Sequence, residues 1–144
     1  MFSRSTVSRW LIAIAVATGL GFSTSQAFAG GKEGVVIQMS DKDPAKWNLA
    51  LNVAKNIQNS RGADKVDVEI VAFGPGLGML LLDSEVGPRL KAAEKDGVQL
   101  RACANTMKKA KKTDKDLYDG VKVVPAGVIE IMDRQSQGWR YIKL

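Results

Sequence analysis

The chain contains one cysteine, Cys103, and no histidine. Cys103 lies at the end of a predicted strand, residues 98–104, and directly precedes Asn105 and Thr106, where a short lysine-rich helix can begin. A thiolate is favoured where a helix N-terminus and lysines such as Lys108 create a positive potential. The lack of histidine removes the usual general base, the usual zinc ligand and every Cys-His pair. The thiol is therefore either a reactive group or a small buried hydrophobic residue, and both interpretations stay open.

Further candidate residues follow the other predicted strands. In an open parallel sheet, ligands bind beyond the carboxyl ends of the strands, where loops and helix N-termini present free backbone N–H groups. The segments expected at this edge are Ser40 and Asp41, Gly74 to Gly78, Cys103 to Thr106, and Pro125 to Gly127. Cys103 is expected in the middle of this set.

The glycines Gly74, Gly76 and Gly78 form the segment GPGLG. Their backbone N–H groups could cradle an anion. However, the segment lacks both the G-x-G-x-x-G spacing and the lysine of a phosphate-binding loop. A tight bend between a strand and a helix therefore explains these glycines better than a phosphate site.

Three methionines, Met39, Met79 and Met107, also fall near the strand ends beside Cys103. Soft sulfur ligands suit Cu(I), so these four residues form a candidate copper site. Methionine is far more often a gap-filling core residue, and no metal or other cofactor is expected.

Strands and helices alternate along the chain. Strands are expected over residues 35–39, 66–73, 98–104, 121–124 and 139–144. Helices are expected to start at Pro44, near Val86, at Asn105, at Thr113 and at Val128, with glycines ending four of them at Gly62, Gly97, Gly120 and Gly138. This order predicts parallel βαβ units in a three-layer α/β/α sandwich around a mainly parallel five-stranded sheet.

Residues 1–29 have the pattern of an export signal peptide. Arg4 and Arg9 supply the positive start, residues 10–22 are apolar and uncharged, and Ala27-Phe28-Ala29 is a small-x-small cleavage site. The apolar stretch is shorter than the roughly 20 residues that cross a bilayer. We therefore expect cleavage after Ala29, a periplasmic or secreted product without a stable membrane anchor, and one domain over residues 30–144.

The composition limits the kinds of molecule that the chain is expected to bind. The chain has 21 Lys and Arg residues against 15 Asp and Glu residues, a formal net charge of +6. Part of this excess belongs to the predicted signal peptide, and the Lys108 to Lys112 run has few aromatic residues around it. We interpret that run as a solvated helix face and expect no nucleic acid. One cysteine cannot form an internal disulfide, so stability must come from packing.

Four segments, in this order, resemble the exported, single-domain branch of the DsrE/DsrF-like family: VVIQMSDKDPAKWNLALNVAKNIQ, VEIVAFGPGLGML, GVQLRACANTMK and VVPAGVIEIMDRQSQGWRYIKL. The resemblance implies a parallel five-stranded α/β/α fold and assembly into homotrimers or hexamers, with the site at subunit boundaries. The family includes cytoplasmic sulfur-relay proteins of the TusD and DsrE type, whose cysteine at the end of the third strand receives sulfur as a persulfide. Cys103 matches that position.

Two functions are therefore hypotheses. In the first, the Cys103 thiolate takes up sulfane sulfur and passes it on by exchange. Asn105 and the amides of Ala104 to Thr106 would stabilise the anion, and Asp41 or Lys108 would tune it. The residues expected to bind a small sulfur-containing anion are Ser40, Gly74, Gly76, Gly78, Ala104, Thr106 and Lys108. In the second hypothesis, a non-enzymatic oligomer presents strand-end pockets to a small anion, a metal or a protein partner, and Cys103 is passive.

Overall fold

The computed structural model describes residues 31–144, so the predicted signal peptide and its cleavage site lie outside the described residues. The strands are β1 (Glu33–Met39), β2 (Val66–Ala72), β3 (Gln99–Cys103), β4 (Lys122–Val124) and β5 (Arg140–Lys143). The α-helices are α1 (Pro44–Arg61), α2 (Gly87–Lys95), α3 (Ala104–Lys109) and α4 (Gly127–Ser136), and the 3-10 helices are η1 (Gly74–Leu80) and η2 (Asp114–Asp116). None of the helices in this part of the chain combines the length and the apolar character that a membrane crossing requires.

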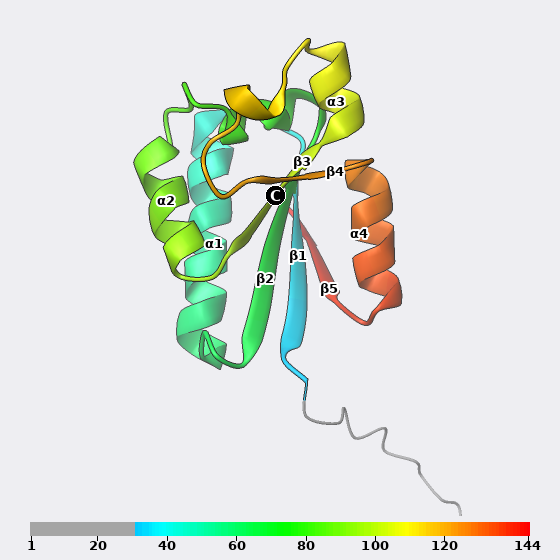
Figure 1. The fold of residues 1–144 in the computed structure, drawn as a ribbon. Helices are drawn as coiled ribbons and strands as arrows, with labels where there is room; N and C mark the ends of the chain where they lie inside the picture. Colours follow the sequence, from blue (N-terminus) through cyan, green and yellow to red (C-terminus); the bar gives the residue numbers. More distant parts are fainter. Residues whose placement is uncertain (1–30) are drawn as a thin grey trace, which may run out of the picture.

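The five strands form one sheet in the order β4-β3-β2-β1-β5, and all neighbouring pairs are parallel. Helices α1 and α2 cover one face of the sheet and α4 covers the other (Figure 1). This arrangement confirms the predicted α/β fold with a five-stranded sheet, and the sheet is wholly rather than mainly parallel. Because the strands are parallel, their carboxyl ends lie at one edge, where α3 and η2 also lie (Figure 1).

Helix α1 begins and ends where the local sequence predicts. The Asp43 side chain accepts a hydrogen bond from the Ala45 N–H at 2.8 Å, and Pro44 occupies the first turn, where no backbone donor is missed. At the other end Gly62 has a φ of 92°, a conformation that side chains disfavour. Trp47 and Leu51 face the core, as their helical spacing indicates.

The segments after β2 and β3 differ from the sequence prediction. The glycine-rich segment is not a simple turn but the 3-10 helix η1. Helix α3 starts one residue earlier than expected, at Ala104, and ends at Lys109 instead of continuing through Lys112. The signal at Thr113 produces only the short helix η2, because a capping box between Thr113 and Asp116 closes a single turn.

The two faces of the sheet are packed unequally. The face under α1 and α2 carries one large cluster of buried apolar residues, contributed by β1, β2, β3, the two helices and η1. The face under α4 carries a small apolar cluster of Val36, Val71 and Ile131, with the partly buried Phe73 and Trp139 against them. Stability is therefore concentrated on the first face, and the second face has room for polar groups.

Candidate functional site

Cys103 is the last residue of β3 and belongs to the face covered by α4. Side chains alternate along a strand, and Leu100 and Ala102 point into the core on the other face. The Cys103 side chain is 5% exposed, yet it is a member of neither apolar cluster. It is therefore buried at the end of β3, outside both clusters.

Hydrogen-bond donors from two helix N-termini approach the Cys103 sulfur. They are the Thr106 hydroxyl, the backbone N–H groups of Asn105 and Thr106 in the first turn of α3, and the Gly127 N–H at the start of α4. Such first-turn N–H groups have no partner within their own helix. The Thr106 hydroxyl oxygen accepts a hydrogen bond from the Gly74 N–H at 2.9 Å, so its own hydrogen is available to the sulfur.

These donors change the acidity of the thiol. Burial alone raises the pKa of Cys103, because it penalises the charged form. The hydrogen bonds from the Thr106 hydroxyl and from the N–H groups of Gly127, Thr106 and Asn105 outweigh burial, so the pKa lies below the ordinary value of 9.0. The thiolate is the nucleophilic form of cysteine, and this position favours it.

Asp41, a predicted partner of the thiol, has a different local role. Its carboxylate forms a 2.8 Å ion pair with Lys46 and accepts a 3.0 Å hydrogen bond from the Asp43 N–H. Its carbonyl accepts a 2.7 Å hydrogen bond from the Trp47 indole. Because β2 separates β1 from β3, the strand of Asp41 runs about 10 Å from that of Cys103. The structure thus places Asp41 at the start of α1 and does not bring it to the sulfur.

The other expected ligand-binding residues divide into two groups. The residues from Cys103 to Thr106 form the thiol segment. Asn105, within it, and Lys108, just after it, have exposed side chains. Ser40 accepts a 3.0 Å hydrogen bond from the Gln38 amide within its own strand end. Only the α3 segment and Gly74, through Thr106, are therefore connected to the sulfur.

The glycines of η1 are explained by close packing. A Cβ atom at Gly76 would collide with the Met39 carbonyl. At Gly78 it would lie 3.2 Å from the Trp47 ring, closer than most Cβ contacts. These two residues bring η1 against β1 and α1, in agreement with a bend that requires glycine.

The methionines expected beside the thiol are on the opposite face. Met39, Met79 and Met107 are buried in the large apolar cluster under α1 and α2, and Cys103 is outside it. The structure therefore does not gather the candidate copper ligands. Within residues 31–144, no group of three or more His, Cys, Asp or Glu side chains could hold a metal ion.

A lysine-rich hollow of about 690 Å³ adjoins the thiol segment. Ala104, Met107 and Val123 supply apolar lining atoms, and three lysines surround them: Lys108, Lys112 and Lys115. Thr113 and Asp114 complete the lining, and Cys103 is not part of it. Lys112 pairs with Asp116 at 3.9 Å and Asp114 offsets part of the remaining charge, so the hollow keeps a small excess of positive charge beside the strand end.

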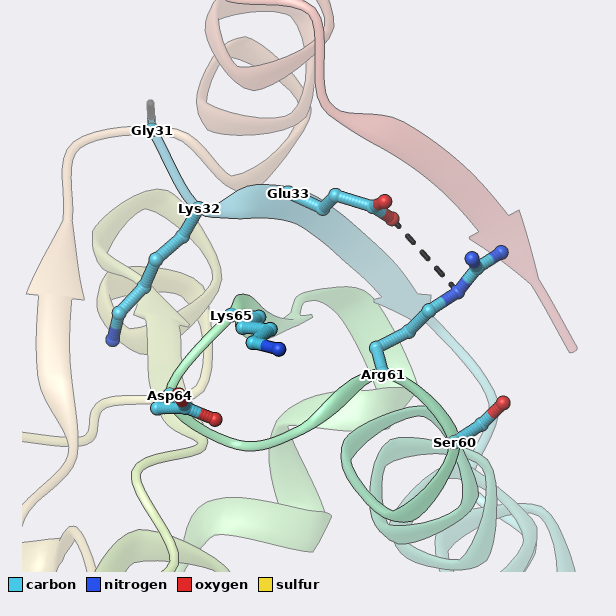
Figure 2. A pocket seen from close by; sticks show the side chains of 7 residues that line it. All are labelled: Gly31, Lys32, Glu33, Ser60, Arg61, Asp64 and Lys65. Carbon is cyan, nitrogen blue, oxygen red and sulfur yellow. Dashed lines mark ion pairs between the residues drawn. The ribbon is translucent and has the colours of Figure 1, made fainter. Parts of the chain in front are cut away.

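A second hollow, of about 510 Å³, lies at the opposite end of the sheet (Figure 2). Three of its charged side chains take part in ion pairs: Glu33 contacts Arg61 at 3.9 Å and Arg140 at 3.0 Å, and Lys32 pairs with Asp67 at 3.2 Å. Figure 2 shows the Arg61 side chain extended toward Glu33. Because Cys103 is at the far end of the strands, this hollow is a weaker candidate than the surroundings of the thiol.

Glu69 is not among the residues that the strand-end rule selects, because it lies in the middle of β2. Its carboxylate is fully buried and contacts Arg101 of β3 and Arg134 of α4. A sequence signal does exist, since a carboxylate within the apolar strand VDVEIVA requires a buried cation. Nothing in the sequence, however, indicates which arginine supplies it.

Comparisons with known proteins agree with this architecture. The model of the DsrE/DsrF-like family matches residues 32–144. A solved structure from Methanobacterium thermoautotrophicum, the protein of unknown function MTH1491, is 31% identical with a TM-score of 0.75, covering 78% of this chain and all of that one. The conserved protein of unknown function BT1422 from Bacteroides thetaiotaomicron is 13% identical with a TM-score of 0.59, covering 78% of this chain and 95% of that one, and shares the fold alone. No curated protein matches the chain.

Proposed function

The chain belongs to the DsrE/DsrF-like family, which is linked to sulfur relay, and from this premise we propose that it carries sulfane sulfur on Cys103. The donor is a polysulfide or persulfide anion. The Cys103 thiolate attacks a sulfane sulfur, the donor's sulfur–sulfur bond breaks, and its electron pair leaves with the shortened donor. An acceptor thiolate then attacks the outer sulfur of the Cys103 persulfide, and the electron pair returns to Cys103.

One observation carries this proposal: hydrogen-bond donors at the starts of α3 and α4 and on the Thr106 side chain lower the pKa of Cys103. Such donors stabilise a thiolate and also the persulfide anion that replaces it. They are fixed by the backbone of α3 and α4, so little rearrangement is needed when charge develops. A purely structural cysteine gains nothing from this arrangement.

The lysine-rich hollow supports an anionic sulfur donor. Lys108, Lys112 and Lys115 border it, and Ala104 joins it directly to the thiol residue along the chain. A cluster of like charges raises the local concentration of anions. In this proposal Lys108 attracts the anionic donor to the thiol, and Asn105 and Thr106 lie next to the bound anion.

The passive alternative is favoured by the low exposure of Cys103, at 5%. In that case the protein is a non-enzymatic binding protein and the thiol fills the sheet edge. Alkylation of the folded protein separates the two functions. A Cys103 that reacts only after unfolding supports the passive role, and rapid reaction below pH 9.0 supports sulfur carriage.

Export and assembly remain part of the proposal. We propose a periplasmic or secreted protein, cleaved after Ala29, that forms a homotrimer or homohexamer. The exposed side chains of Val128, Ile129 and Met132 on α4 support assembly, because they form an apolar surface next to Gly127. Cell fractionation and the mass of the purified protein in solution test these two points.

Polysulfide loading tests the sulfur-carrier function. The purified protein is incubated with inorganic polysulfide, and its intact mass is measured before and after treatment with dithiothreitol. We expect a gain equal to one or more sulfur atoms that dithiothreitol removes. The matched variant Cys103→Ser should show no gain. An unmodified wild type, or an equal gain on Cys103→Ser, would end the proposal.

A further inference from the structure

Glu69 forms ion pairs that link two strands of the sheet to helix α4 on the thiol face. It lies in β2 with Val68 and Ile70 pointing into the opposite core, so its side chain faces α4. Arg134 of α4 donates from Nε to Glu69 Oε1 at 3.2 Å and from Nη2 to Oε2 at 2.9 Å. Arg101 of β3 donates to Oε2 at 3.0 Å. The carboxylate is thus held by a two-pronged contact from the helix and a single contact from the sheet.

A buried ion pair of this kind is weak evidence for stability. Removing a carboxylate from water is costly, and well-packed apolar residues often serve a fold equally well. Burial raises the pKa of Glu69 above its ordinary value, although Arg134 and Arg101 oppose this. The pair does fix the orientation of α4 on the sheet. The two parallel N–H groups of a guanidinium, its fork, fit a carboxylate in few orientations.

Helix α4 has little else to hold it in place. Ile131 is its one fully apolar anchor among the buried residues, packed on Val36 and Val71. Arg134 makes additional contacts: it pairs with Glu130 at 3.0 Å and lies 4.6 Å from the centre of the Trp139 ring. Arg134 is therefore the residue through which α4 is oriented on the sheet.

The spacing along α4 connects this ion pair to the thiol. Gly127, Ile131 and Arg134 are separated by four and three residues, which places them on one helix face. Gly127 lies about 10 Å along the helix from Arg134, at 1.5 Å per residue. On the sheet, Glu69 is paired with Gln99, and Cys103 lies four residues farther along β3, about 13 Å.

The two lengths agree to within about 3 Å, so a helix held by Arg134 at Glu69 begins near Cys103. The start of α4 rests directly on the end of β2, where a Cβ atom at Gly127 would lie 3.0 Å from the Phe73 ring. Building on the proposed function of Cys103, we propose that Glu69 and Arg134 are positioning residues. Their ion pair sets the rotation and depth of α4 so that the Gly127 N–H stays directed at the sulfur.

The test measures the pH profile of Cys103 alkylation by iodoacetamide in the full folded protein. Arg134→Met removes the fork and leaves Glu69 paired with Arg101. We expect the apparent thiol pKa to rise and alkylation at neutral pH to slow about fivefold, the size expected when one hydrogen bond to the thiolate is lost. Glu69→Gln should shift the profile in the same direction, and Arg134→Lys, which keeps the charge without the fork, should restore it only in part.

The control is Arg140→Met, which removes an arginine that also pairs with a strand glutamate, Glu33, but on the surface. Its profile should match wild type. Wild-type profiles in folded Arg134→Met and Glu69→Gln would overturn the positioning role. If Arg134→Met does not fold, Arg134→Lys and Glu69→Gln decide by the same criterion. Polysulfide loading of wild type is measured separately, so its absence would overturn the proposed function and an unshifted profile only this inference.

Discussion

The two faces of the sheet, one under α1 and α2 and the other under α4, bury different kinds of residue. The first buries a continuous apolar cluster with Ile70 and Leu100 at its centre. The second buries a cluster of three apolar residues, the Glu69 carboxylate and Cys103. Apolar packing contributes stability without direction, whereas ion pairs and hydrogen bonds fix direction at little net gain. The comparison indicates that stability and thiol chemistry can be altered separately.

The largest expected effect is a loss of folding stability on the face packed under α1 and α2. Leu100→Ala should lower the free energy of unfolding by about 3–4 kcal/mol, because Leu100 is almost fully buried and leaves a cavity. Urea unfolding followed by circular dichroism measures this loss. The pH profile of Cys103 alkylation in the folded variant should remain that of wild type, and a changed profile would contradict the separation of the two faces.

The equivalent truncation on the other face should cost less. Ile131→Ala should lower the free energy of unfolding by about 2 kcal/mol, the lower end for such changes, because few side chains surround Ile131. The same urea measurement compares it with Leu100→Ala. Unlike Leu100→Ala, it should also slow alkylation of Cys103, since α4 loses its apolar anchor. A stability loss equal to that of Leu100→Ala would remove the contrast.

Thr106 tests the hydrogen bonding of the thiol itself. Its hydroxyl stabilises the thiolate and thereby lowers the pKa of Cys103, so Thr106→Val should raise that pKa. At a pH below the pKa the thiolate fraction then falls, and alkylation at neutral pH should slow about fivefold. In wild type the midpoint of the profile should lie below 9.0. Thr106→Ser keeps the hydroxyl and is the matched control; equal slowing in both variants would assign the effect to packing.

The smallest expected effect is a change in the alkylation rate of Cys103 on removal of one backbone N–H group. Gly127→Pro removes the N–H that faces Cys103, at a first helical position where proline costs no helix hydrogen bond. Alkylation at neutral pH should slow about threefold relative to Gly127→Ala. The alanine variant keeps the N–H and introduces the same Cβ contact with Phe73. Identical rates in the two variants would show that this N–H does not act on the sulfur.

Local signals in the sequence were sufficient for the order of the elements and for several of their ends. The start of α1 follows from the Asp43 cap and Pro44, and its end from Gly62. The parallel sheet follows from alternating strands and helices. The strand-end rule also identified Cys103, Thr106 and Gly127 as neighbours, because parallel strands bring their carboxyl ends to one edge.

Other expectations failed where packing acts over a distance. Met39, Met79 and Met107 were expected near Cys103, but they point to the opposite face, since being close to a strand end does not determine the side. Asp41 is two strands away from the thiol and serves α1. The length of η1 and the early end of α3 depend on contacts with the core that no local pattern encodes.

The sequence by itself determined the fold class, the family and the single cysteine as the candidate nucleophile, because these depend on residue types and on spacings of a few positions. Only the tertiary structure decided that Cys103 lies under α4 and that Glu69 binds Arg134, 65 positions away. Such a contact forms only after the chain has crossed the sheet and laid α4 on its sparsely packed face. Its partners are chosen by the geometry of the assembled layers, which local spacing does not contain.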